Sequence, residues 1–397
     1  MTYTENKFIE IISNYINGIK EIDILPEEID TKRMKELFKI HRLMGIGYSY
    51  LKDYEIEGDL IPSLESGFFS EVTQYQRRQF VFQRIKEILT KQSIKHVCFK
   101  GSYLGNYYPV KELRTMSDLD IYIAPADRDR GRKILIEKGA DPMEKVSDST
   151  VDVYNFHSIN IEVHNNLVSD GIWMNGVNFE EYYKNIFDKC ELMENCTYKI
   201  NDNDHLVYLI FHAAKHFYES GIGVRMLMDF PIIVRNSDHI DWDYVWQELE
   251  KIKLDAFASK IFIICGKIFG EFGVCYKNKP EFEQADRMIK FIIDGGVYGF
   301  SNKSGDVRRL RNKSATKDGK QNLFVGTIRM LFPSSKEMRR ISEWYANKPA
   351  ILLPVAYAGR IIVNIKERGG LFKVLKSAPE VYNDSADKSD ILKIMNL

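Results

Sequence analysis

The segment from His96 to Ile123 constrains the fold more than any other part of the sequence. It reads H-V-C-F-K-G-S-Y-L-G-N-Y-Y-P-V-K-E-L-R-T-M-S-D-L-D-I-Y-I. Val97 to Phe99 form a short apolar run that Lys100-Gly101-Ser102 ends, which predicts a buried strand followed by a tight turn. Tyr103 to Tyr108 can make about two helical turns before a proline stops them. The segment therefore predicts strand, glycine turn, short helix and second strand.

Two aspartates open the second strand of this segment. Side chains alternate along a strand, so Asp118 and Asp120 project from one face and Leu119 from the other. Neighbouring carboxylates repel each other unless a positive charge lies between them, and hard oxygen ligands suit Mg²⁺ or Mn²⁺. An isolated D-x-D is more often a solvated strand start. Here the Lys-Gly-Ser turn, whose backbone amides can hold a phosphate, favours a metal and phosphate site.

Three short patterns carry a family resemblance: F-K-G-S-x-L, then L-R-T-M-S-D-L-D-I-Y-I, then I-E-V-H. They resemble the nucleotidyltransferase superfamily of DNA polymerase beta type, and within it the bacterial group described as uncharacterised nucleotidyltransferases. The resemblance is strong over residues 94–166 and weaker over 205–229 and 331–360. It implies Mg²⁺- or Mn²⁺-dependent transfer of a nucleotidyl group from an NTP, with ATP expected first, to a hydroxyl acceptor with release of pyrophosphate.

The resemblance also implies a third carboxylate from a neighbouring strand, which the I-E-V-H pattern assigns to Glu162. On that strand Glu162 shares a face with His164, which can be a second partner of the site, a base or a hydrogen-bonded structural residue. Asp152 on the preceding strand is the rival for the third position. A salt-bridged surface residue is the structural alternative for Glu162. Together Asp118, Asp120 and Glu162 are the expected catalytic and metal-binding groups.

The turn before the aspartates is the expected nucleotide site. Ser102 and the backbone at Gly101 would hold the β- and γ-phosphates. Lys100 and Arg114 can neutralise phosphate charge or orient the aspartates. Arg114 also stands four residues before Asp118, which permits a plain ion pair between them.

A histidine stripe follows in N-D-N-D-H-L-V-Y-L-I-F-H-A-A-K-H-F-Y, which begins with capping residues and continues as an apolar helix. A zinc-protease reading fails because H-A-A-K-H lacks the glutamate of H-E-x-x-H. His212 and His216 can belong to a buried structural network, contact the acceptor or a phosphate, or bind a metal. Arg225 and Asp229, which the resemblance also reaches, stand four apart and can pair.

The chain predicts an α+β fold, with a small mixed-sheet core between two helical regions. The expected parts are N-terminal helices over 1–93, the α/β core over 94–168, a mostly helical domain over 169–378 with a basic loop at 301–322, and a polar tail over 379–397. Helices are predicted near 68–91, 125–138, 241–253, 254–272, 324–332 and 341–363, and strands at 143–147, 151–156 and 159–164. A two-residue connection at His157-Ser158 predicts an antiparallel hairpin.

Composition limits the partners. Lysine plus arginine equal aspartate plus glutamate at 56 each, and no basic, aromatic-interleaved stripe favours nucleic acid. Five cysteines without a C-x-x-C pair and an acidic first segment without an apolar core predict a cytoplasmic protein without a signal peptide. No apolar run reaches the roughly 18 residues of a membrane span.

The expected partners are therefore an NTP and a hydroxyl-bearing small molecule, sugar or protein side chain. A nucleotide-binding regulator without turnover and a protein-interaction scaffold are the alternative classes. Three clustered carboxylates argue against both alternatives, since a retired site has no need to keep costly like charges together.

Overall fold

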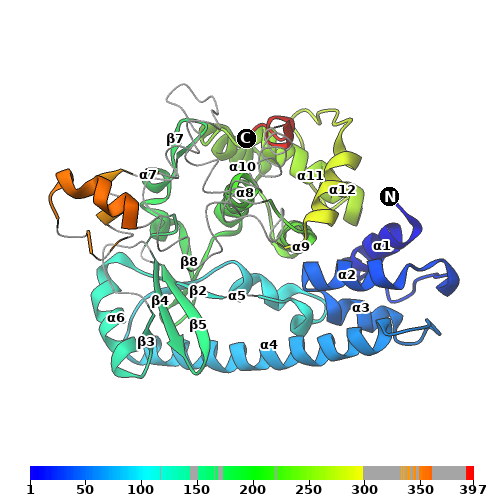
Figure 1. Ribbon diagram of the computed structural model, residues 1–397, viewed down its shortest axis with the longest axis horizontal. Coiled ribbons are helices and arrows are strands. Elements are labelled where there is room, and N and C mark those ends of the chain that lie inside the picture. Colours follow the sequence, from blue (N-terminus) through cyan, green and yellow to red (C-terminus); the bar gives the residue numbers. More distant parts are fainter. Residues whose placement is uncertain are drawn as a thin grey trace. The chain divides into compact units, whose positions relative to one another are not determined.

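The computed structural model describes residues 1–116, 118–143, 151–164, 166–168, 173–219 and 221–297, with scattered positions between 332 and 359 and the last residues, 390–397. The chain forms two compact units, residues 1–299 with 395–397 and residues 300–394. All predicted site residues belong to the first unit, which Figure 1 shows as a sheet and a long helix beneath a group of shorter helices.

A seven-stranded mixed sheet forms the centre of the first unit, in the order β3-β4-β5-β2-β1-β9-β8. Its strands are β1 (His96–Cys98), β2 (Leu119–Ile123), β3 (Asp141–Pro142), β4 (Val151–Phe156), β5 (Ile159–His164), β8 (Cys190–Glu194) and β9 (Thr197–Ile200). β2 runs parallel to β5 and antiparallel to β1, and β1 runs parallel to β9. This mixed sheet, with the helices around it, confirms the predicted α+β class.

The predicted hairpin forms at the expected residues. β4 and β5 pair antiparallel from Val151 with His164 to Phe156 with Ile159. His157 and Ser158 both have positive φ, 50° and 64°, which is the backbone that a two-residue type I′ connection requires. The strand predicted at 143–147 falls largely on residues outside those described, and the adjacent described strand is the short β3.

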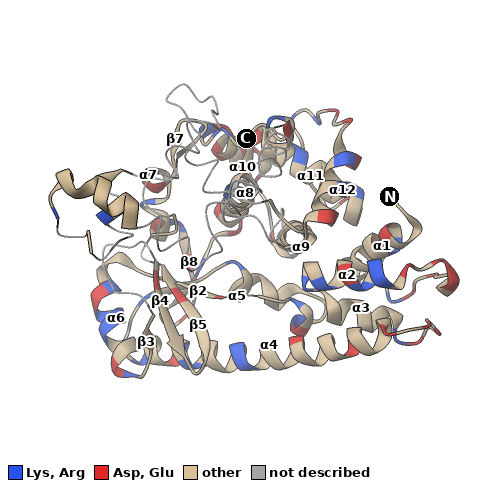
Figure 2. Cartoon of the chain, in the orientation of Figure 1, with Lys and Arg blue, Asp and Glu red and all other residues tan. Residues whose placement is uncertain are grey.

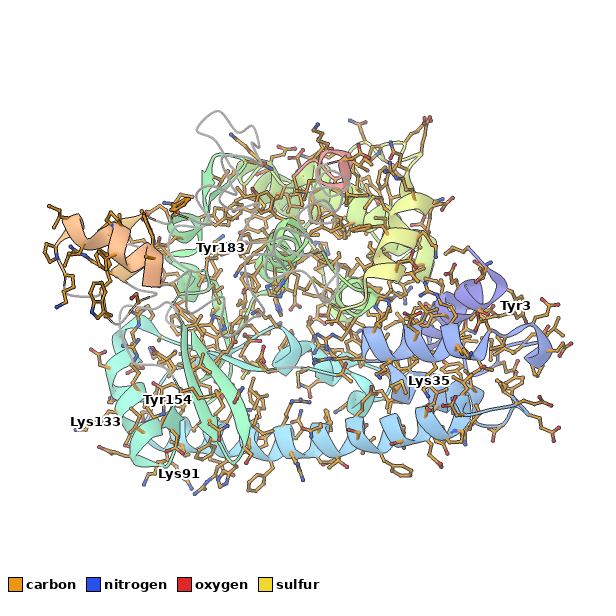
Figure 3. The ribbon with its side chains drawn as sticks, in the orientation of Figure 1. Tyr3, Lys35, Lys91, Lys133, Tyr154 and Tyr183 are labelled. Carbon is orange, nitrogen blue, oxygen red and sulfur yellow. The ribbon has the colours of Figure 1, made fainter. Side chains whose placement is uncertain are left out.

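One face of the sheet is covered by the long helix α4 (Leu60–Lys91) and by α6 (Arg128–Glu137). Ile85 of α4, Ile121 of β2 and Ile161 of β5 belong to the core between them, together with Tyr154, which is labelled in Figure 3. Burying each such side chain contributes about 1.5–3 kcal/mol. Because residues alternate along a strand, this core fixes which side chains of β2, β4 and β5 face the other way.

The N-terminal helices are α1 (Tyr3–Asn17), α2 (Thr31–His41), α3 (Met44–Leu51) and α4. A capping box between Thr2 and Glu5 begins α1, with each side chain bonded to the other residue's backbone. The predicted helix at 68–91 is confirmed but begins earlier, at Leu60. The helix predicted at 125–138 follows β2. The structure divides it into a 3₁₀ turn (Pro125–Asp127) and α6.

The described part of the chain from 173 to 297 is mostly helical. It contains α7 (Phe179–Tyr183), α8 (Asp202–Glu219), α9 (Val224–Asn236), α10 (Trp242–Lys251), α11 (Asp255–Phe269) and α12 (Ala285–Gly295), and a small pair of strands, β6 (Trp173–Met174) and β7 (Val177–Asn178). The Asn201 side chain accepts the N–H of Asp204 at the start of α8, which supplies the predicted cap. Figure 2 shows both signs of charge interspersed on these helices.

The four strands described in this region were not predicted. Cys190–Glu194 and Thr197–Ile200 pair as β8 and β9 and extend the central sheet beyond β1. Asn195 has φ 48° in the tight turn between them. Short polar strands of this kind carry little hydrophobic periodicity, so their pairing with the sheet decides their structure.

In the second unit, Met338, Tyr345 and Ala356 form a small buried cluster. The predicted basic loop at 301–322 and all but the last residue of the helix predicted at 324–332 lie outside the described residues. Only parts of 341–363 are described, including the 3₁₀ turn Ala350–Leu352. Among the described helices, none is both long and apolar enough to cross a membrane.

Candidate active site

A pocket of about 610 Å³ opens on the face of the sheet opposite α4 and α6. Its walls come from the turn after β1, from β2, β4 and β5, and from α8 and α9. The lining includes most of the residues predicted for the site: Lys100, Gly101, Arg114, Asp118, Asp120, Glu162, His164, His212, His216, Arg225 and Asp229. Ser102 is not part of this lining, and its hydroxyl donates to the Phe99 carbonyl at 2.7 Å.

The three predicted acids lie together on one wall of this pocket. Asp120 on β2 is directly opposite Glu162 on the parallel strand β5, so their side chains share a face. Asp118 precedes β2 by one residue and also lines the pocket. Residues some forty positions apart in sequence thus converge because β2 and β5 are neighbours in the sheet.

Asp152, the rival for the third acid, lies on the other face. It is buried, and its carboxylate accepts a hydrogen bond from Arg132 of α6. Its neighbours Val151 and Val153 are the β4 residues that line the pocket. Asp152 is therefore a structural partner of α6. Its side chain faces away from the pocket that Asp118 and Asp120 line.

Asp120 is the most tightly held of the acids. Its Oδ1 accepts hydrogen bonds from Lys100 Nζ at 3.0 Å and from His164 Nε2 at 2.8 Å. Burial acts to raise the pKa of Asp120, but the Lys100 charge and the His164 hydrogen bond outweigh it and hold the pKa well below its ordinary value. Asp120 is therefore a carboxylate at neutral pH. Lys100 donates to this carboxylate, as in the predicted alternative in which Lys100 orients the aspartates.

Glu162 is in the opposite electrostatic position. Burial raises its pKa to about 7, and the neighbouring charges of Asp120 and Asp118 add to the increase. The ligating atoms of Asp120, Glu162 and His164 all lie within 4.8 Å of one another. Oxygen and imidazole donors at this spacing suit a divalent cation, which would also relieve the repulsion that raises the pKa of Glu162. Asp120, Glu162 and His164 thus fit a metal ion, whereas Asp118 lines the same pocket without belonging to this group of three.

The turn after β1 is fixed from the helical side. Lys100 has φ 50° and ψ −131°, a positive-φ conformation that is uncommon for a residue with a side chain. Its N–H donates to Nε2 of His205 at 3.1 Å, and His205 is fully buried. Burial lowers the pKa of His205 to about 4, so the ring is neutral and can accept this bond. His205 is therefore a structural residue of the turn.

Arg114 lies over Gly101. A Cβ added to Gly101 would be 2.3 Å from Nη1 of Arg114, so the glycine is required by close approach of this side chain. Arg114 Nε and Nη2 donate to the two oxygens of Asp229, at 3.0 and 2.9 Å. Tyr108 also donates to Asp229, at 2.6 Å. Bidentate pairing of this kind fixes the guanidinium firmly.

The pairing predicted for Asp229 is therefore corrected. Asp229 binds Arg114, on the loop before β2, in a bidentate ion pair, while Arg225 donates to the carbonyl and hydroxyl of Thr115 at 3.2 and 3.3 Å. A pair within α9 was expected from four-residue spacing alone. The long-range pair forms instead because α9 packs beside the Arg114 loop.

His212 and His216 face the pocket from α8, with ring centroids 4.4 Å apart. Burial, with the nearby charges of Lys100, His216 and Lys215, holds the pKa of His212 well below its ordinary value. Lys215 also lines the pocket, and its charge acts to lower the pKa of Glu162. Sequence reasoning missed Lys215, although it lies one turn after His212 on the same helix.

The family described as "Uncharacterised nucleotidyltransferase" matches residues 27–270, more than half of the chain. This match includes β1, β2, β5, α8 and α9, and so every residue of the predicted site. No curated protein and no solved structure matches the chain. The resemblance inferred from the F-K-G-S, S-D-L-D and I-E-V-H patterns is confirmed, and the chain belongs to the family of uncharacterised nucleotidyltransferases.

Proposed function

We propose that this protein transfers a nucleotidyl group from an NTP, ATP being the first candidate, to a hydroxyl acceptor and releases pyrophosphate. The observation that carries the proposal is the convergence of Asp118, Asp120 and Glu162 on a pocket that Lys100 and Arg114 also line. Acidic and cationic side chains that line one pocket suit a reaction that consists mainly of positioning and charge neutralisation.

Asp118, Asp120 and Glu162 would hold Mg²⁺ or Mn²⁺, with His164 beside them. A divalent ion at this position would neutralise triphosphate charge and increase the acidity of the acceptor hydroxyl. Lys100 remains hydrogen-bonded to Asp120 and adds positive charge at the same wall. His164 orients the Asp120 carboxylate from the other side.

The bonding changes balance without a further reactant. The acceptor oxygen forms a bond to the α-phosphorus, the bond from that phosphorus to the β-bridging oxygen breaks, and pyrophosphate leaves with the electron pair. The hydroxyl proton passes to the Glu162 carboxylate, because Oδ1 of the neighbouring Asp120 already accepts hydrogen bonds from Lys100 and His164.

The phosphates of the donor would lie at the Gly101 end of the pocket. Gly101 lines the pocket there, and the fixed guanidinium of Arg114 occupies the space that a side chain at Gly101 would need. Arg114 would thus contact a donor phosphate, one of the alternatives predicted for it, while its ion pair is with Asp229 rather than with Asp118. Ser102, whose hydroxyl donates to backbone carbonyls of Phe99 and Asp120, would support the turn rather than the phosphate.

The test is incubation of the protein with each NTP labelled at the α-phosphate, with Mg²⁺ or Mn²⁺ and a cell extract, followed by identification of labelled products. We expect a labelled acceptor and free pyrophosphate that both disappear with EDTA. A nucleotide-binding regulator would instead show Mg²⁺-NTP binding, measured as a higher melting temperature, without pyrophosphate. A scaffold would show neither.

A further inference from the structure

The side chains that face the pocket change from charged to apolar across the sheet, from the turn after β1 to β4. Glu162 is directly opposite Asp120 of β2 on one side and Val153 of β4 on the other, and His164 is opposite Val151. Directly opposite residues share a face. The acids therefore lie between the turn after β1 at one end and the two valines of β4 at the other.

Positive charge gathers at the first end. Lys100 begins the turn, and Arg114 Nη1 lies against Gly101, where a Cβ would be only 2.3 Å away. Arg225 is held beside them through its bonds to Thr115. A triphosphate is therefore favoured at this end of the pocket.

The β4 end presents apolar side chains to the same pocket. Val151 and Val153 are half-buried and line it, and Leu167, which follows β5, is also part of the lining. α8 adds the apolar Leu209 and Phe211 to the lining, together with His212, Lys215 and His216. A ligand that covers these apolar side chains removes them from water, which favours its binding.

The chemistry relates these two ends. In nucleotidyl transfer the attacking and leaving oxygens lie roughly in line on opposite sides of the phosphorus. With the leaving pyrophosphate toward Gly101, the acceptor approaches from the β5 and β4 side, where Glu162 receives the proton. The part of the acceptor next to its hydroxyl then lies against Val153 and Val151.

We infer, on the basis of the proposed function, that the acceptor carries its reacting hydroxyl on an apolar group, an aromatic ring or an alkyl chain. A polyol such as a sugar would place further hydroxyls against the valines and leave them without partners. An unpaired buried hydroxyl costs about 1–3 kcal/mol, so each one lowers transfer by roughly tenfold or more. The apolar alcohol can be a free small molecule or a tyrosine side chain.

The experiment compares four acceptors with α-labelled ATP and Mn²⁺: 2-phenylethanol, N-acetyltyrosinamide, glycerol and glucose. We expect kcat/KM for at least one of the first two to exceed that for both polyols by about tenfold or more. Preference for 2-phenylethanol points to a free alcohol and preference for N-acetyltyrosinamide to a tyrosine.

Val153→Thr, which keeps the shape of the side chain and adds a hydroxyl, tests the residue itself. The ratio of kcat/KM between the better apolar acceptor and glycerol is expected to fall by about fivefold or more, because a hydroxyl now faces the apolar group. Val177→Thr is the matched control: Val177 is also a half-buried strand valine, on β7, and is not part of the pocket lining, so its ratio stays that of the wild type.

Use of glycerol or glucose at least as fast as both apolar alcohols, or an unchanged ratio in Val153→Thr, overturns the inference and leaves the proposed function standing. A wild-type protein that moves no label from any NTP to any alcohol, to water or to extract components overturns the proposed function as well.

Discussion

Asp120 joins two charged networks through a single carboxylate oxygen, and this decides which acid is best to mutate. Its Oδ1 accepts from both Lys100 and His164, and Lys100 is largely buried. Asp120→Asn would leave the Lys100 ammonium without its counter-charge, at a cost of about 3–5 kcal/mol. Lost activity in that variant would mix chemistry with stability. Asp118, just outside β2, is the cleaner choice.

The third acid can be tested by comparing Glu162→Gln with Asp152→Asn. Glu162→Gln is expected to reduce kcat by about 10²–10⁴-fold with little change in melting temperature, because the group lines the pocket and is the proposed proton acceptor. Asp152→Asn is expected to lower the melting temperature while the remaining folded protein stays active, because its partner is Arg132 of α6. The reverse pattern in paired kcat and melting measurements contradicts the assignment of Glu162.

Gly101 and Gly105 form a second matched pair. A methyl group on Gly101 meets Arg114 Nη1 at 2.3 Å, whereas one on Gly105 comes no closer than 3.8 Å to the same side chain. Gly101→Ala is therefore expected to displace Arg114 from Asp229 and raise the KM for the NTP by about tenfold or more. Gly105→Ala should keep the wild-type KM. Equal KM values in the two variants would show that the Gly101 approach is unrelated to nucleotide binding.

His41 gives the protein a defined pH dependence of stability. The ring is fully buried beside the Ile293 carbonyl, and burial lowers its pKa to about 4 from an ordinary 6.5. As the pH falls, the unfolded chain binds a proton at His41 before the folded chain does. The stability that depends on a neutral His41 is therefore fully present above pH 6.5 and is lost as the pH falls toward 4. That contribution reaches about 3 kcal/mol.

Urea unfolding at pH 7.5 and pH 5 measures this contribution. The loss of unfolding free energy between the two pH values should be smaller in His41→Gln than in the wild type. His239→Gln, at an exposed position, should keep the wild-type difference. An equal difference in all three proteins would contradict the role of His41.

At the scale of elements, the close crossing of α3 and α4 depends on a glycine. A Cβ at Gly67 of α4 would be 2.3 Å from Cβ of Met44, at the start of α3. Gly67→Ala should destabilise the protein by about 1–3 kcal/mol, because neither backbone can move independently. Gly266 of α11 has nothing within 4 Å of the same position, so Gly266→Ala should stabilise by about 0.5–1 kcal/mol. Thermal unfolding of both variants tests the pair, and shifts of the same sign would contradict it.

Elements with a strong local signal were the predictable ones. The β4–β5 hairpin follows from alternating residues around a two-residue connection, and α10 and α11 follow from apolar periodicity. β8 and β9 carry no comparable signal, because Leu192 and Met193 are exposed at the sheet edge and only pairing with β1 orders the segment. The local hydrophobic pattern thus predicts helices and strands that bury one face. It fails for strands whose structure depends on pairing with a neighbouring strand.

At the scale of the whole molecule, the shared face of the two aspartates was predictable and the supports of the candidate site were not. Strand alternation places Asp118 and Asp120 on one face, whereas the family resemblance pointed to Glu162, which the pairing of β2 with β5 sets opposite Asp120. The bond from Lys100 to His205 and the pair of Arg114 with Asp229 join residues 105 and 115 positions apart. Both depend on how α8 and α9 pack against the turn, which spacing along the chain does not encode.

The central claim is that the acid cluster transfers a nucleotidyl group, and Asp118→Asn tests it most directly. Labelled product from α-labelled ATP is measured with wild type and variant in Mg²⁺ or Mn²⁺, alongside their melting temperatures. We predict at least a ~10³-fold lower rate in the variant with the fold retained, since the bound metal supplies much of this chemistry. A folded Asp118→Asn protein that forms product at the wild-type rate would contradict the account.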